Sequence, residues 1–138
     1  MQNNTTTKPL NQNKMEKEFV PYELVVKLKA LGFDEECFGY YHVNVGYTKG
    51  YAFCYFDKPK RFKDGFDLLA PTFSQAFRWF REKNGFPIPY IQRLTKMGEV
   101  FYVSQIIDLM NPINTSTYEE AELACLEKLI EIVEPISE

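Results

Sequence analysis

Two helix starts that follow the same pattern constrain this chain more than any other feature of its sequence. Thr72 is followed three residues later by Gln75, and Thr117 is followed at the same spacing by Glu120. A Thr just before a helix and a Gln or Glu three residues on can cap each other's backbone N–H groups, an arrangement called a capping box. The aromatic residue and the alanine behind each cap repeat in phase: Phe73 with Tyr118, and Ala76 with Ala121. The sequence therefore predicts two helices that begin alike.

The segments before these helices have the composition of strands. Four runs are rich in aromatic and β-branched residues, and turns that contain glycine join them in pairs. The pairs are 37–45 with 51–56, and 88–94 with 100–107. Pro21 and Gly32 suit the start and the end of a further helix near the N-terminus. We expect an α+β fold, with an N-terminal helix followed by two ββα units whose helices pack on one face of an antiparallel sheet.

The length and the distribution of apolar residues indicate one main domain. The chain has 138 residues, of which 45% are hydrophobic, and this is enough to bury a core. We assign the domain to residues 18–135 and interpret its two ββα halves, about 37–85 and 88–134, as an internal duplication. Residues 1–17 are polar, so we expect a flexible tail. The charged segment 57–69 is predicted to be a solvated loop.

Charge and cysteine content argue against several classes of protein. A formal net charge of −3 and a pI near 5.3 argue against a generally basic nucleic-acid-binding protein. Cys37, Cys54 and Cys125 form no CxxC pair and follow no signal peptide, which favours reduced thiols and a cytoplasmic location. No apolar run approaches the roughly 18 residues that a membrane helix needs. We therefore expect no membrane partner.

Chemistry-bearing motifs are few. The sequence has no glycine-rich nucleotide loop, no HExxH zinc motif and no GxSxG nucleophile motif. The single histidine, His42, lies among aromatic residues on a predicted strand, where a structural role is common. A catalytic pair of His42 with Cys37 or Cys54 would require spatial closeness, and Glu122 is a further titratable candidate. We expect no metal and no cofactor, and a small enzyme of unknown class is the last alternative.

The helix predicted from Phe73 carries the first candidate binding residues. Trp79 lies at the margin of its apolar stripe, with Arg78 beside it and Arg81 further along. An aromatic ring flanked by guanidinium groups suits a protein partner or a planar ligand. Covering the rim of the core is the alternative role for Trp79.

The last helix carries a second candidate. Glu122 falls among apolar residues of that helix, at the position that corresponds to Phe77 in the first ββα unit. A carboxylate there either reaches solvent or has a specific partner. Leu123 and Ile130 emerge on the opposite side of the helix, as a patch that could meet the first helix or another subunit.

Three stretches of the chain are similar to a known group of proteins. They are Phe19–Glu23 with Leu31–Glu35, Leu69–Lys83, and Thr117–Val133. These stretches resemble small proteins that Bacteroidetes and their phages and prophages encode, a group with no assigned activity, cofactor or catalytic residue. The resemblance implies a context, namely a phage or mobile-element accessory protein that works in the bacterial cytoplasm or is packaged in a virion.

Two functional hypotheses follow from these observations. The first is a non-enzymatic protein that binds a host or phage protein and forms a homo-oligomer through the last helix or a sheet edge. The second is a protein that binds a nucleotide or single-stranded nucleic acid, with aromatic rings that stack on bases and arginines that bind phosphate. Its residues would be Tyr40, Tyr41, Trp79, Arg78 and Arg81.

Overall fold

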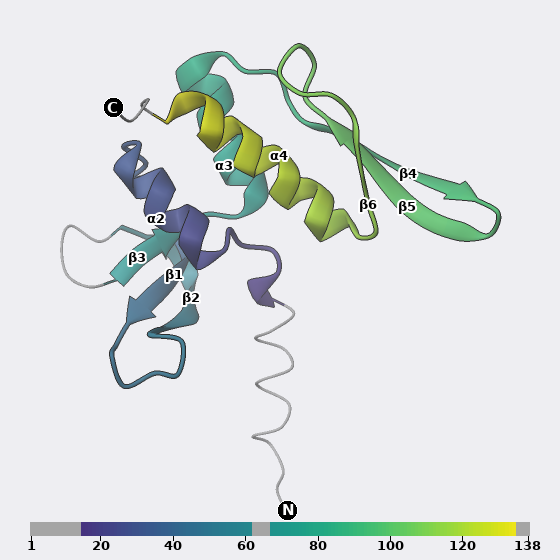
Figure 1. Ribbon diagram of the computed structural model, residues 1–138. Coiled ribbons are helices and arrows are strands. Elements are labelled where there is room, and N and C mark those ends of the chain that lie inside the picture. Colours follow the sequence, from purple (N-terminus) through teal and green to yellow (C-terminus); the bar gives the residue numbers. More distant parts are fainter. Residues whose placement is uncertain (1–14, 62–66, 135–138) are drawn as a thin grey trace, which may run out of the picture. The chain divides into compact units, whose positions relative to one another are not determined.

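The computed structural model describes residues 15–61 and 67–134 of the chain. Within these residues the fold is α+β, with the helices α2, α3 and α4 and two three-stranded antiparallel sheets (Figure 1). Most of the predicted tail, residues 1–14, lies outside the described residues. The α+β class is confirmed, but the strands form two separate sheets where a single sheet was predicted.

The chain divides into two compact units. Of the described residues, the N-terminal unit contains those up to Lys29 and those between Asp34 and Thr72, and the C-terminal unit contains Ala30–Phe33 and those from Phe73 on. The main boundary therefore lies just before the helix at Phe73, whereas the duplication hypothesis placed it after that helix. The helix at Phe73 belongs with the last helix of the chain.

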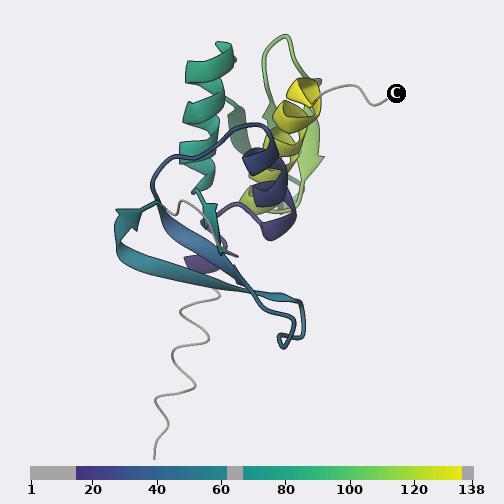
Figure 2. The same cartoon turned by 90° about the vertical axis from the view of Figure 1, so that its left-hand side faces the viewer.

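The N-terminal unit holds α2 (Tyr22–Ala30) and the sheet β2-β1-β3. Its strands are β1 (Cys37–Val43), β2 (Tyr51–Lys60) and β3 (Asp67–Ala70). The predicted hairpin of β1 and β2 is confirmed, and Figure 2 shows it as a strongly twisted ribbon in blue. The prediction of a loop over 57–69 is wrong at both ends, because β2 continues to Lys60 and β3 pairs with the free edge of β1.

One face of this sheet, which we call the inner face, is covered by the segment that leads into α2. The Phe19 ring lies 5.0 Å from the ring of Phe53, and Tyr22 stacks on Tyr51 at 4.1 Å. Gly39 makes the approach of Phe19 possible, since a Cβ atom at this position would lie 2.7 Å from the Cδ2 atom of Phe19. The core of the unit therefore depends on the absence of a side chain on the central strand.

The C-terminal unit combines α3 (Phe73–Asn84), the sheet β4-β5-β6 and α4 (Tyr118–Val133). The strands are β4 (Tyr90–Lys96), β5 (Glu99–Gln105) and the short β6 (Ile113–Thr115). The hairpin of β4 and β5 was predicted, and β6 was not. Met97 and Gly98 both have positive φ, 54° and 84°, as a tight two-residue hairpin turn requires.

The two predicted helices begin and end close to where the sequence indicated. The capping box of α4 is confirmed, because the Thr117 hydroxyl accepts a hydrogen bond from the Glu120 N–H, and the Glu120 carboxylate accepts one from the Thr117 N–H. The strand orders, however, differ between the halves. In the N-terminal unit the central strand is β1, which is the first of its three strands along the chain. In the C-terminal unit the central strand is β5, which is the second of its three. The two sheets are therefore not copies of one topology.

Candidate functional site

The face of the first sheet opposite the inner face carries a cluster of aromatic and titratable side chains. Gly39 and Tyr41 point to the inner face, so their neighbours along β1 point away from it. The strand register adds side chains from β2 and β3 to the same side. We call this side the outer face, and its members are Phe38, Tyr40, His42, Cys54, Phe56, Asp67 and Leu69.

Stacked rings form the centre of the outer face. The rings of Tyr40 and Phe56 are 4.6 Å apart and nearly parallel, and the Lys60 ammonium lies 4.8 Å from the centroid of Phe56. A cation over an exposed ring is stabilised by about 0.5–1 kcal/mol. The pKa of Tyr40 is raised from its ordinary value, first by burial and then by its hydrogen bond with Cys54. The phenol therefore stays neutral, and Phe38 beside it is 45% exposed.

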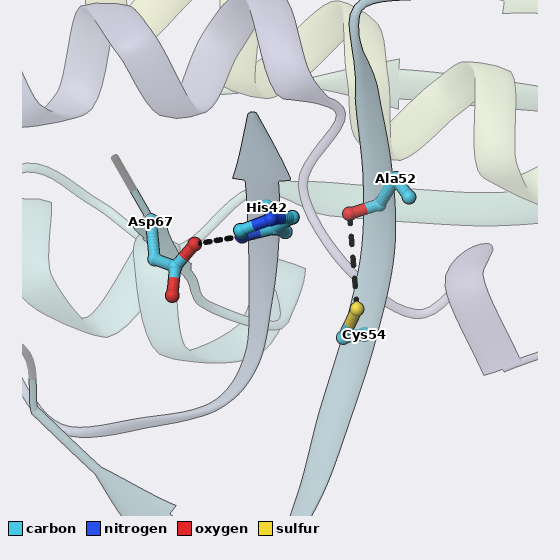
Figure 3. A network of polar contacts seen from close by, with 4 residues as sticks. All are labelled: His42, Ala52, Cys54 and Asp67. Carbon is cyan, nitrogen blue, oxygen red and sulfur yellow. Dashed lines mark hydrogen bonds and ion pairs between the residues drawn. The ribbon is translucent and has the colours of Figure 1, made fainter. Parts of the chain in front are cut away.

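A His–Asp pair forms the second part of the outer face. His42 on β1 and Asp67 on β3 are direct cross-strand partners, and the Nδ1 atom of His42 lies 2.5 Å from the Oδ1 atom of Asp67 (Figure 3). Tyr47 packs edge-on against the imidazole, with its centroid 5.9 Å away. The side chains of His42 and Asp67 are 40% and 28% exposed, so their interaction contributes at most about 1 kcal/mol to the stability of the fold. Its main effect is to fix the imidazole on the surface.

The cysteines do not complete a catalytic pair with this histidine. Cys54 lies opposite Tyr40 in the register, and Figure 3 shows its sulfur directed to the carbonyl of Ala52, 4.0 Å away, while the His42 ring is directed to Asp67. Cys37 is buried on the inner side and donates to the Glu35 carbonyl. A nucleophile needs a base within hydrogen-bond reach, so this geometry does not support a catalytic pair of His42 with Cys37 or Cys54.

Two of the predicted stacking residues are core side chains. Tyr41 is 1% exposed, and Trp79 is 8% exposed, with Phe33 packed edge-on against it at 5.5 Å. Neither ring has a free face on which a base could stack. Trp79 is therefore a core residue, which was the alternative to its role in partner binding.

The remaining predicted residues belong to different units of the chain. Arg78 and Arg81 are exposed on α3 of the C-terminal unit, whereas Tyr40 belongs to the outer face of the N-terminal unit. Glu122 on α4 lines a pocket of the C-terminal unit together with Phe77. Asp67 was not among the predicted site residues, because the segment 57–69 was predicted to be a loop, and Phe56 lay on a predicted strand but was not proposed as a site residue. Only the register, which brings Asp67 opposite His42, identifies their shared face.

Residues 15–61 and 67–134 contain no group of three His, Cys, Asp or Glu side chains arranged to hold a metal ion. No described helix is long and apolar enough to cross a membrane.

Comparisons with known proteins give no relative for this arrangement. No protein-family model matches the chain, and neither the curated proteins nor the solved structures contain a significant match.

Proposed function

We propose that this protein is a non-enzymatic binding protein whose outer face receives a protein partner. The observation that carries the proposal is the stack of Tyr40 and Phe56 beside the exposed Phe38, on the face of the sheet that the Phe19–Tyr22 segment does not cover. Aromatic residues are enriched at the centres of protein interfaces, where large rings with few rotatable bonds bury area at low entropic cost. A sheet that fixes such rings supplies a pre-ordered binding surface.

The polar groups of the outer face suit the rim of an interface. The His42–Asp67 pair lies on one side of the rings, and the Lys60 ammonium lies on the other. A hydrogen-bonding rim around an apolar centre is the usual anatomy of a protein interface. We infer a partner surface with an apolar centre and a carboxylate that reaches Lys60.

The same stack makes nucleotide binding a weaker candidate. A base would need an open ring face, but the Phe56 ring is stacked on Tyr40 and also contacts Lys60. The arginines proposed to bind phosphate lie on α3, in the other unit. The residues that the nucleotide hypothesis combined are therefore divided between the two units.

The resemblance to Bacteroidetes and phage proteins makes a host or phage protein the proposed partner.

Self-association is also retained as a proposal, and the last helix and a sheet edge were the two surfaces suggested for it. Ile130 is 1% exposed, so half of the suggested patch on α4 is already covered within the chain. The edge strand β4 carries exposed Arg93 and Lys96, charges that discourage pairing between edge strands. We therefore expect any dimer to form through the outer face, which light scattering of Phe38→Ser would test.

Site-specific photo-crosslinking tests the binding proposal. A photoreactive phenylalanine analogue replaces Phe38 on the outer face, and in a matched variant it replaces Tyr55, which is 49% exposed and points to the inner side of the same sheet. We expect one discrete adduct, in cells that carry the gene, from position 38 and none from position 55. The same adduct from both positions, or none from position 38, would contradict the proposal.

A further inference from the structure

The strand β4 forms a free edge of the sheet in the C-terminal unit. It lies at one end of the strand order β4-β5-β6 (Figure 1), and all seven of its residues pair with β5. Among the described residues, no backbone group outside β5 forms a hydrogen bond with β4. Every residue of the strand is exposed or half-buried. The outer edge therefore presents backbone N–H and C=O groups with which an extended segment could pair.

Two cations lie on this edge strand, and it carries no carboxylate. Arg93 and Lys96 are both exposed, and neither forms an ion pair with another described residue. Glu99 is the register partner of Lys96 on β5, whereas the register partner of Arg93 is the uncharged Tyr102. A second copy of β4 would bring like charges to this edge, and an acidic strand would bring opposite charges.

The spacing of the two cations defines the kind of acidic segment that fits. Side chains alternate along a strand, so residues three positions apart point to opposite faces of the sheet. Arg93 shares a face with Tyr102, whose ring centroid lies 6.0 Å from that of Tyr118 on α4. Lys96 is therefore on the face away from α4. An extended segment meets both cations only if its own carboxylates are an odd number of residues apart, and a spacing of three matches the strand directly.

Half-buried apolar side chains accompany each cation. Ile91 is on the same face as Arg93, and Leu94 is on the same face as Lys96. A strand added beside β4 would cover both of them if it carried apolar residues next to its carboxylates. In strand addition, main-chain hydrogen bonds supply affinity and alternate side chains supply specificity. The edge of β4 offers both.

The other described edge strands suit an acidic segment less well. The strand β2 is also an edge, but its cations lie beside Asp57, which repels carboxylates, and Pro59, which has no N–H to donate. The edges β3 and β6 have only four and three residues. Of the described edges, β4 is thus the one that combines length with an unmixed positive charge.

We propose that the outer edge of β4 binds an extended acidic segment of a partner protein. The segment joins the sheet as a further antiparallel strand, and two of its carboxylates, three residues apart, lie opposite Arg93 and Lys96. The neighbouring pairs of this sheet are antiparallel as well. The inference does not depend on the outer face, which belongs to the other unit.

Two short peptides test the charge requirement. The first is acetyl-Glu-Thr-Val-Glu-Thr-Val-Tyr-amide, and in the second both Glu residues are replaced by Lys. Titration of the full-length protein at low ionic strength, followed by backbone amide NMR, should give saturable shifts at β4 and β5 with the acidic peptide. We expect the basic peptide to bind at least about tenfold more weakly. Equal affinities, shifts confined to β2, or no saturable binding of the acidic peptide would overturn the proposal.

A charge reversal on the strand locates the contact. Arg93→Glu should weaken binding of the acidic peptide by at least about threefold, and a peptide with Lys in place of the second Glu should restore it. Lys49→Glu makes the same change in net charge at an exposed turn of the other unit, and it should leave the affinity unchanged. No weakening in Arg93→Glu, or no recovery with the Lys peptide, would contradict the site.

N-methylation of the acidic peptide separates strand addition from attraction between charges alone. Along an antiparallel strand, alternate residues direct their N–H groups to the neighbouring strand. Methylation of one alternate set should therefore abolish binding, and methylation of the other set should preserve it. Equal effects of the two sets would contradict strand addition. Tighter binding of single-stranded oligothymidylate at the same residues would indicate a phosphate ligand instead and would also contradict the proposal.

Discussion

The hydroxyl of Tyr41 donates a hydrogen bond of 3.0 Å to the backbone carbonyl of Val20, and this contact fastens the central strand of the first sheet to the segment before α2. Both residues are almost fully buried. Tyr41→Phe would leave the carbonyl of Val20 without this donor in the core. We expect a loss of about 1–3 kcal/mol in the free energy of unfolding, measured by urea denaturation. An unchanged denaturation midpoint would show that the hydrogen bond makes no net contribution to the free energy of unfolding.

The same tyrosine predicts a loss of stability in alkali. Burial raises the pKa of Tyr41 above its ordinary value of 10.0. The stabilising effect of the neutral phenol is therefore fully present below pH 10, and it declines above that pH because the unfolded chain loses its proton first. Each such proton lowers the free energy of unfolding by about 1.4 kcal/mol per pH unit. Tyr41→Phe should reduce this alkaline slope, and an equal slope in both proteins would contradict the assignment.

Gly39 provides a test of the packing on the inner face. A Cβ atom there would lie 2.7 Å from the Phe19 ring and 3.0 Å from the Phe53 ring. We expect Gly39→Ala to destabilise the fold by about 1–3 kcal/mol, because both rings are held by the core. Gly46→Ala, in the exposed turn between β1 and β2, is the control and should change stability by less. Thermal unfolding followed by circular dichroism would distinguish the two.

The three cysteines should differ in reactivity. Cys37 and Cys125 are buried, and Cys54 is half-buried on the outer face. Burial also raises the pKa of Cys125, so its thiolate is disfavoured. A thiol reagent should therefore label Cys54 in the folded protein, and all three in urea. Mass spectrometry of labelled peptides would show this, and early labelling of Cys125 would contradict the described core.

The cap of α4 allows a test of one local interaction. Thr117→Ala removes the hydroxyl that accepts from the Glu120 N–H and should cost about 1 kcal/mol. Ser116→Ala should cost less, since Ser116 takes part through its backbone N–H. Equal losses in urea denaturation would indicate that the cap contributes little.

The sequence predicted local structure better than long-range pairing. The bounds of α3 and the capping box of α4 follow from residues within one or two turns, so the periodicity and the Thr117–Glu120 spacing were sufficient. The strand β3 depends on the register with β1, which no local pattern encodes. Trp79 was placed at the margin of its helix by the same periodicity, but Phe33, distant in the sequence, covers it.

For the candidate sites too, the sequence predicted local features and not long-range contacts. Helical spacing matched Glu122 with Phe77, and the structure places both at one pocket. The sequence could not predict that residues 88–91 complete that pocket. Nor could it predict that Asp67 meets His42, because that contact exists only through the pairing of β1 with β3.

The most direct test of the proposed binding role is the affinity of the partner recovered by crosslinking for three purified proteins. Phe38→Ser alters the outer face, and Tyr55→Ser changes a side chain of similar exposure on the inner side of the same sheet. We expect Phe38→Ser to raise the dissociation constant by at least about tenfold, as for an aromatic residue at the centre of an interface, and Tyr55→Ser to leave it close to that of the original protein. An unchanged constant in Phe38→Ser together with a large loss in Tyr55→Ser would contradict the account.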